Sequence, residues 1–266
     1  MAQRQAVFPP HRLGIAATLR RDTWWLEPLL FAIGLVAFFG YLSVSAFLDR
    51  WAFEIGPYHS PVFEFGPFIF LEDKLKEGFG PWFLSPAFII LWGPAGFRLT
   101  CYYFRKAYYR AIFWAPPACA VGDLPTRYHG ETRFPFLLQN LHRYFMYVAL
   151  VLVWFQWANA IRGFHDPDEG WGIGLGSVFL VVDSALLSLY LFSCHALRHL
   201  VGGGLDCFSC SRWNMVRKRG WDVVSRLNAN HGLWAWLSLF SVALTDVYIR
   251  LVANGHITDP NTWNSF

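Results

Sequence analysis

Long apolar segments recur along the chain and limit the folds that it can adopt. Five of them hold about 20 or more mostly apolar residues each, and they cover residues 26–48, 82–104, 136–161, 173–201 and 227–253. An α-helix needs about 20 such residues to cross the hydrocarbon core of a bilayer. Charged residues make up only 15% of the chain, against about 25% in a typical soluble domain. The sequence therefore predicts an all-α polytopic membrane protein, in which residues 1–266 form one domain built as a bundle of five transmembrane helices.

Basic residues are distributed unevenly between the predicted loops. They concentrate in the N-terminal segment and in the second and fourth loops: Arg4, Arg12, Arg20, Arg21, Arg105, Lys106, Arg110, Arg127, Arg133, Arg212, Arg217, Lys218 and Arg219. By the positive-inside rule the N-terminus is cytoplasmic, and residues 1–25 are expected to lie along the membrane interface. We therefore expect a multi-pass protein of the cell inner or plasma membrane that contacts lipid headgroups. The sequence carries no nucleic-acid-binding motif, so nucleic acid is not an expected partner.

Four histidines lie near the predicted cytoplasmic ends of the spans. His142 falls in the third span, His231 in the fifth, and His195 and His199 in the last two turns of the fourth. Cys101 lies at a similar depth in the second span. Ionisable groups inside a bilayer are costly and mark functional sites by default. These residues therefore predict a bound metal or redox cofactor at the cytoplasmic end of the bundle.

A compact Cys/His motif follows the fourth predicted span. His195 and His199 are four residues apart and share a helix face. The run "GGG" lets the chain turn, and "CFSC" presents two cysteines as a chelating pair. Two cysteines and two histidines can hold a Rieske-type 2Fe-2S cluster or a structural zinc ion, whereas two facing histidines could hold a b-haem. The first choice of metal ligands is therefore His195, His199, Cys207 and Cys210.

Two further expectations concern the cysteines near this motif. Because the cytoplasm keeps thiols reduced, no disulfide is expected between Cys207 and Cys210. Cys194 precedes His195, and on a continuous helix its side chain points about 100° away from that histidine. Cys194 is therefore excluded from the expected ligands.

Charged residues within the spans suggest a quinone site and one alternative function. Arg98 and Tyr102 are one turn apart, and they would either donate hydrogen bonds to a quinone carbonyl or anchor the helix at the interface. Asp246 and Arg250 are four residues apart and predict an ion pair. In the alternative, Arg98, Asp183 and Asp246 line the pathway of a small membrane transporter. The sequence has no motif of a soluble catalytic site, so no residue is predicted to be catalytic.

Several long stretches together resemble one known family. They are "GFRLTCYYFRKAYYRAIFWAPPACAV", "LLQNLHRYFMYVAL", "SCHALRHLVGGGLD" and "NANHGLWAWLSLF" with the later "LTDVYIRL". They resemble the cytochrome b-like membrane anchor subunit of actinobacterial, mycobacterial-type succinate dehydrogenase, respiratory complex II, over nearly the whole chain. The resemblance implies a flavoprotein subunit and an iron-sulfur subunit as partners and a quinone, menaquinone or ubiquinone, as substrate. It also implies a Rieske-type 2Fe-2S cluster in place of the b-haem of other such anchors.

The resemblance also provides a second set of possible ligands. The family pattern emphasises Cys101 and Cys119, which the local motif does not include. The rival quartet of ligands is therefore His142, His231, Cys101 and Cys119. A set that mixes the two quartets stays open as well. The implied function is that of a membrane anchor and quinone-reducing subunit, which passes electrons from the iron-sulfur subunit through an intramembrane centre to a quinone. The alternatives are a b-haem anchor of a related quinone oxidoreductase and the small transporter.

Overall fold

The computed structural model describes residues 14–48, 54–62, 86–124, 130–134 and 136–263. Residues 1–13 of the expected interfacial segment and the first four residues of the predicted second span lie outside the described residues. So does most of the predicted first loop.

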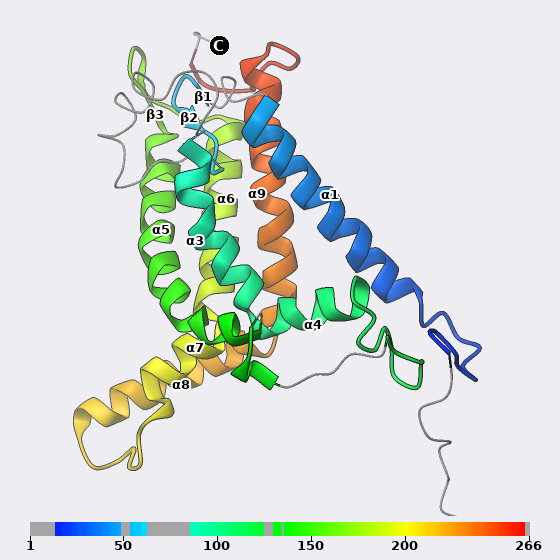
Figure 1. Cartoon of the computed structure of the whole chain (residues 1–266). Helices are drawn as coiled ribbons and strands as arrows, with labels where there is room; N and C mark the ends of the chain where they lie inside the picture. Colours follow the sequence, from blue (N-terminus) through cyan, green and yellow to red (C-terminus); the bar gives the residue numbers. More distant parts are fainter. Residues whose placement is uncertain (1–13, 49–53, 63–85, 125–129, 135, 264–266) are drawn as a thin grey trace, which may run out of the picture.

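The described chain is built around long apolar helices that alternate up and down along the bundle, with α1 inclined to the others (Figure 1). They are α1 (Leu26–Leu48), α3 (Pro86–Thr100), α5 (His142–Arg162), α6 (Leu175–Phe192) and α9 (His231–Ala253). Four segments of the described part are long and apolar enough to cross a membrane: Leu26–Ser45, Phe136–Arg162, Leu175–Phe192 and His231–Ala253. The helical membrane architecture is thus confirmed. Because only 15 residues of α3 are described, the count of five spans stays a prediction.

Helix α6 lies between α5 and α9 and packs against both, while α3 packs along α5. The approach of α3 to α5 depends on two glycines. A Cβ atom at Gly96 would collide with the ring of Phe145, and one at Gly93 would lie 2.9 Å from Val148. Small residues of this kind let membrane helices approach closely, because van der Waals packing replaces the hydrophobic effect between helices in lipid.

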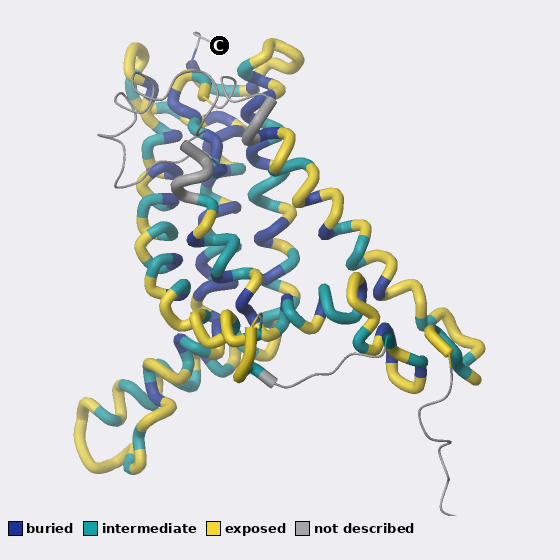
Figure 2. The backbone as a smooth tube through the Cα atoms, in the orientation of Figure 1, coloured by how far each residue is buried: buried dark blue, intermediate teal, exposed yellow. Residues whose placement is uncertain are grey.

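The inner sides of the helices are mostly buried, and much of the outer side is exposed (Figure 2). Leu30, Val36 and Trp154 are 57%, 67% and 74% exposed, on helices whose inner faces are buried. Apolar patches this extensive are rare on soluble proteins. The outward faces therefore match a surface that contacts lipid.

One end of the bundle carries two short β-hairpins and the C-terminal segment (Figure 1), and we refer to it as the hairpin end. Strands β1 (Glu54–Ile55) and β2 (Tyr58–His59) pair antiparallel, as do β3 (His165–Asp166) and β4 (Gly170–Trp171). Tyr58 is fully buried, and its hydroxyl donates a 2.9 Å hydrogen bond to Asp259. This contact holds the first hairpin on the bundle.

Short helices occupy the opposite end, which we call the break end because two long apolar segments break there. Helix α4 (Tyr102–Ala111) turns away from α3 and lies across the bundle (Figure 1). Two 3-10 turns (Gly130–Thr132 and Phe136–Leu141) precede α5. Helix α7 (His195–Arg198) and a π-helical turn (His199–Gly203) lead into α8 (Arg212–Asn228), which projects from the bundle.

The breaks correct several predicted helix boundaries. The second span does not run to Phe104, because Cys101 adopts an extended conformation with φ −64° and ψ 129°. The fourth span does not run to Val201, because Cys194 adopts the same conformation with φ −65° and ψ 137°. His142 and His231 are the first residues of α5 and α9, so both α-helices begin a few residues later than the predicted spans, although His142 still lies within the apolar segment Phe136–Arg162.

Candidate metal centre

The two breaks place two cysteine thiols in the core of the protein at the break end. Cys101 and Cys194 are 3% and 1% exposed, and both belong to the cluster of buried residues at that end. Each cysteine precedes a short helix without making a side-chain cap. An extended residue between two helices directs its side chain differently from a helical one, so both thiols point inward.

Each thiol contacts one imidazole ring. The Cys101 Sγ atom lies 3.4 Å from Nε2 of His231, and the Cys194 Sγ atom lies 3.2 Å from Nε2 of His142. The two histidines begin α9 and α5, so four different segments supply the four side chains. We call Cys101, His142, Cys194 and His231 the break-end quartet.

The second nitrogen of each ring contacts a hydroxyl group. The Thr100 hydroxyl lies 3.0 Å from Nδ1 of His142, and the Ser193 hydroxyl lies 2.7 Å from Nδ1 of His231. Each hydroxyl residue immediately precedes one cysteine, and its histidine contacts the other cysteine. The arrangement is therefore two crossed Thr/Ser–His–Cys arrays. Partners on the second nitrogen fix the orientation of an imidazole that binds metal through its first nitrogen.

Aromatic rings enclose the two imidazoles. His142 is stacked on Phe97 with ring centres 4.8 Å apart, and His231 is stacked on Tyr190 at 5.1 Å. Phe97 and Tyr190 are themselves buried. The histidines are thus held in fixed orientations, with their Nε2 atoms toward the thiols.

Within the part of the chain that the structure describes, no three His, Cys, Asp or Glu side chains form a group that could hold a metal ion. The break-end quartet is instead two Cys–His pairs. A tetrahedral zinc site needs its ligands to converge on one point, whereas a 2Fe-2S cluster distributes four ligands over two irons. Two cysteine sulfurs and two histidine nitrogens are the donor types of both a Rieske-type 2Fe-2S cluster and a structural zinc site.

The first-choice ligands do not come together. His195 and His199 are exposed, and Nδ1 of His199 lies 3.0 Å from the guanidinium of Arg143. Cys207 and Cys210 form a disulfide with a Cα–Cα distance of 5.7 Å. The expectation that these two thiols stay reduced is contradicted, and a disulfide sulfur cannot act as a thiolate ligand.

The rival quartet is gathered except for one member. Cys119 is exposed in the loop after α4, where its backbone oxygen accepts a hydrogen bond from Arg20. Cys194 takes the fourth position instead. Its exclusion assumed a continuous helix through His195, and the break at Cys194 removes that assumption. The sequence places a hydroxyl residue before both cysteines, as "TC" and "SC", but the same "SC" precedes Cys210, so this pattern alone could not have identified Cys194.

A cavity of about 1090 Å³ lies at the break end, between α1, α3, α4 and the turn before α5. Arg98 and Tyr102 both line it. They do not form one donor pair, because the break at Cys101 separates them. Arg98 turns inward and donates to the oxygens of Ala235 and Ser238 at 2.9 Å, whereas Tyr102 is 71% exposed.

Two other walls of this cavity are polar. Tyr108 donates to the oxygen of Leu99 at 3.1 Å and accepts from Gln139 at 3.1 Å, and burial raises the pKa of its phenol. The cavity thus combines apolar walls with several hydrogen-bonding groups, as small-molecule sites do. None of the described residues that line it is a histidine, and the same holds for a second cavity of about 290 Å³ inside the bundle. Neither cavity therefore offers a histidine to a haem from the described residues that line it.

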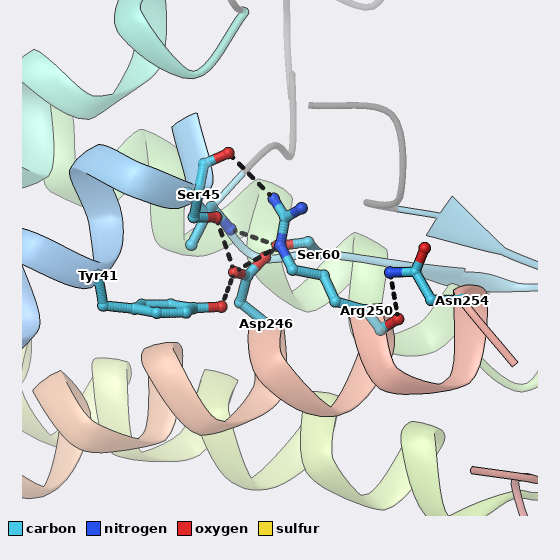
Figure 3. Close-up of polar contacts among 7 residues, drawn as sticks. Tyr41, Ser45, Ser60, Asp246, Arg250 and Asn254 are labelled. Carbon is cyan, nitrogen blue, oxygen red and sulfur yellow. Dashed lines mark hydrogen bonds and ion pairs between the residues drawn. The ribbon is translucent and has the colours of Figure 1, made fainter. Parts of the chain in front are cut away.

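At the hairpin end, Asp246 forms a separate buried centre (Figure 3). Its carboxylate accepts hydrogen bonds from Tyr41, Ser45 and Ser60, and from Nε of Arg250 at 3.0 Å. Asp246 is fully buried and Arg250 is 7% exposed. The predicted Asp246–Arg250 ion pair is confirmed.

Four helices long and apolar enough to span a bilayer, with two buried Cys–His contacts at one end, define a polytopic membrane protein. The family model described as "Actinobacterial succinate dehydrogenase subunit SdhC" matches residues 26–255, and the chain belongs to this family. It is thus a membrane subunit of a succinate dehydrogenase complex. The expected family resemblance is confirmed.

A solved structure supports the same assignment. A chain of the Mycobacterium smegmatis Sdh1 complex in the apo form is 43% identical to this chain, with a TM-score of 0.83. The match covers 95% of this chain and 97% of that one. No curated protein matches the sequence.

Proposed function

We propose that this subunit anchors a flavoprotein subunit and an iron-sulfur subunit to the membrane and completes electron delivery from succinate to a quinone. The observation that carries the proposal is the crossed pair of Thr100–His142–Cys194 and Ser193–His231–Cys101 arrays. Membership of the SdhC family supports the assignment to the complex.

The break-end quartet would hold a Rieske-type 2Fe-2S cluster. Such a cluster, when bound, supplies one-electron transfer at a higher potential than an all-cysteine cluster. The chain's own contribution is orientation and exclusion of water: Thr100 and Ser193 fix the two rings, and Phe97 and Tyr190 cover them. This set keeps three members of the rival quartet and replaces Cys119 by Cys194.

The cavity of about 1090 Å³ is the proposed quinone site. Thr100 lines the cavity and also contacts His142, so the cavity wall adjoins the quartet. Arg98 and Tyr102 would donate hydrogen bonds to the two sides of a menaquinone or ubiquinone headgroup. The apolar walls, which include Leu35 and Phe39 of α1, suit an isoprenoid tail.

The soluble partners are expected to dock at the break end. Helix α8 is amphipathic and exposed there, and basic residues are frequent on α4 and α8: Arg105, Lys106, Arg110, Arg212, Arg217, Lys218, Arg219 and Arg226. The same basic residues support a cytoplasmic N-terminus and a multi-pass location in the plasma membrane. Electrons would then enter at the end that carries the quartet.

The test is to measure iron, acid-labile sulfide and haem in the purified complex, together with the electron paramagnetic resonance (EPR) spectrum after reduction. The soluble subunits contribute iron of their own, so the comparison is between the wild-type complex and a complex carrying Cys194→Ser. We expect the variant to lack one 2Fe-2S signal and two irons per complex. Equal iron contents, or haem in the wild type, would refute the cluster.

A further inference from the structure

Asp183, in the middle of α6, is a buried carboxyl group that the proposed function does not use. It is 0% exposed. Gln156 on α5 donates a 3.3 Å hydrogen bond to Oδ2, and Oδ1 has no hydrogen-bond partner among the described residues. The Ser241 hydroxyl on α9 is also within reach of this carboxyl, and the Arg98 guanidinium on α3 attracts its charge. The carboxylate of Asp246, by contrast, accepts hydrogen bonds from four donors.

No described cation bonds to Asp183 directly. The Arg98 guanidinium donates to Ala235 and Ser238 and lies 4.6 Å from the ring of Tyr190. An isolated carboxylate is strongly disfavoured in a low-dielectric interior, so such a group carries a proton instead. The burial of Asp183 therefore disfavours a bare carboxylate at this position.

Other unsatisfied polar atoms lie inside the same bundle. The described residues with such buried atoms include Tyr190 and Asp183 on α6, Asn159 on α5 and Thr245 on α9. Buried polar atoms without protein partners are normally satisfied by ordered water. The interior is thus expected to hold water around Asp183, where a dry apolar core would hold none.

A second cavity lies between the partner of Asp183 and the wall of the proposed quinone site. The cavity of about 290 Å³ is lined by Gln156, which bonds Asp183, and by Arg98 and Tyr190. Arg98 also lines the cavity of about 1090 Å³. At 1.5 Å per residue, Asp183 lies about 14 Å from the break end of α6, a distance that a few water molecules can cover.

We propose that Asp183 is a proton-relay site that supplies the quinone cavity through the water around Gln156 and Arg98. The inference rests on the proposed quinone site. Reduction of one quinone takes up two electrons, which come from succinate, and two protons. Asp183 gives its proton to the adjoining water, which passes a proton along the Arg98 side of the cavity to a quinone oxygen. The Asp183 carboxylate then takes up a replacement proton that bulk water delivers through the water around Gln156, so the protons of the reduced quinone come from bulk water.

The test uses the intact complex with Asp183→Asn, which keeps the shape of the side chain but cannot release a proton. We expect succinate-driven quinone reduction to fall at least 10-fold. Succinate oxidation with a soluble dye and the EPR spectrum of the quartet should stay unchanged. Asp183→Glu should restore part of the rate. Ser184→Ala is the matched control on the helix of Asp183. It removes hydrogen bonds to the backbone oxygens of Leu180 on α6 and Gln156 on α5 and should leave quinone reduction within 2-fold of wild type.

A spectroscopic readout separates a relay from a structural role. Redox-induced infrared difference spectra of the wild-type complex should contain a protonated-carboxyl band that shifts in D₂O and disappears in Asp183→Asn. A wild-type rate in Asp183→Asn, or a band that persists in it, overturns the proposal. If Asp183→Asn does not assemble, the frequency of the carboxyl band must differ between the wild type and Asp183→Glu. Absence of a protonated-carboxyl band from the wild-type spectrum also overturns the proposal. Loss of the quartet's EPR signal would instead contradict the proposed function.

Discussion

Two buried polar centres at opposite ends of the bundle are satisfied in different ways. At the hairpin end, the Asp246 carboxylate receives hydrogen bonds from three hydroxyl groups and from Arg250 (Figure 3). At the break end, each thiol contacts one ring nitrogen, and each ring has one hydroxyl behind it. The Asp246 carboxylate is paired with Arg250, and both of its oxygens accept hydrogen bonds. In the break-end quartet, the sulfur and nitrogen atoms that could bind a metal face one another.

This difference shows which centre can take a ligand. A buried carboxylate with four donors gains nothing from another partner, so its role is to join α1, α9 and the first hairpin. Thiolate and imidazole donors are the ligands of iron-sulfur clusters. Burial together with an incomplete set of partners, rather than burial alone, is therefore the reason for proposing the cluster at the break end.

The largest expected effect comes from the thiols of the break-end quartet. Cys101→Ser combined with Cys194→Ser should abolish one 2Fe-2S EPR signal and lower quinone reduction more than about 100-fold, because even outer-shell changes at metal sites cost about 10–100-fold. Cys119→Ser is the matched control, since that thiol is exposed and away from the quartet. Wild-type quinone reduction and an unchanged EPR spectrum in the double variant would contradict a functional difference between the break-end quartet and the Asp246 centre.

At the hairpin end, the expected effect is on stability. Asp246→Ala leaves Arg250 buried without its partner, which should cost about 3–5 kcal/mol of unfolding free energy. The measurement is unfolding of the complex in detergent, with the EPR spectrum as a second readout. The double change Asp246→Leu with Arg250→Met should recover most of the loss. A change in the EPR signal of Asp246→Ala complexes that remain folded would contradict the separation of the two centres.

A smaller effect is expected from the hydroxyl groups behind the rings. Thr100→Val and Ser193→Ala each remove a partner of Nδ1 while keeping the four ligands, so cluster retention should drop about 10–100-fold. Iron content after dialysis against a chelator measures this loss. Ser188→Ala, on the same helix as Ser193 but bonded to Trp157, should retain the wild-type iron content.

The smallest effect is expected at the disulfide. Cys207→Ser with Cys210→Ser should leave the EPR spectrum and the iron content of the complex unchanged, because neither sulfur belongs to the quartet. Loss of the cluster in this variant would restore the first-choice ligands and remove the break-end quartet from the proposed function.

Much of the fold follows from the sequence, and part of the site does too. Segments of apolar residues located four described spans, and the depth of His142 and His231 placed both near one end. The sequence argument went wrong where it treated the fourth span as unbroken, because Cys194 was then turned away from the other donors. Helical periodicity is a local rule, and one extended residue is enough to reset the direction of the following side chains.

The sequence by itself determined that this chain is a helical membrane protein and which residue types can hold a cofactor, because span length and donor chemistry are properties of local sequence. The tertiary structure decided which cysteines meet which histidines. Cys101 and His231 are 130 residues apart, and Cys194 and His142 are 52 apart, so only the packing of α3, α5, α6 and α9 brings their atoms together. Backbone breaks at two buried cysteines create that geometry, and their position depends on contacts between helices that no single segment contains.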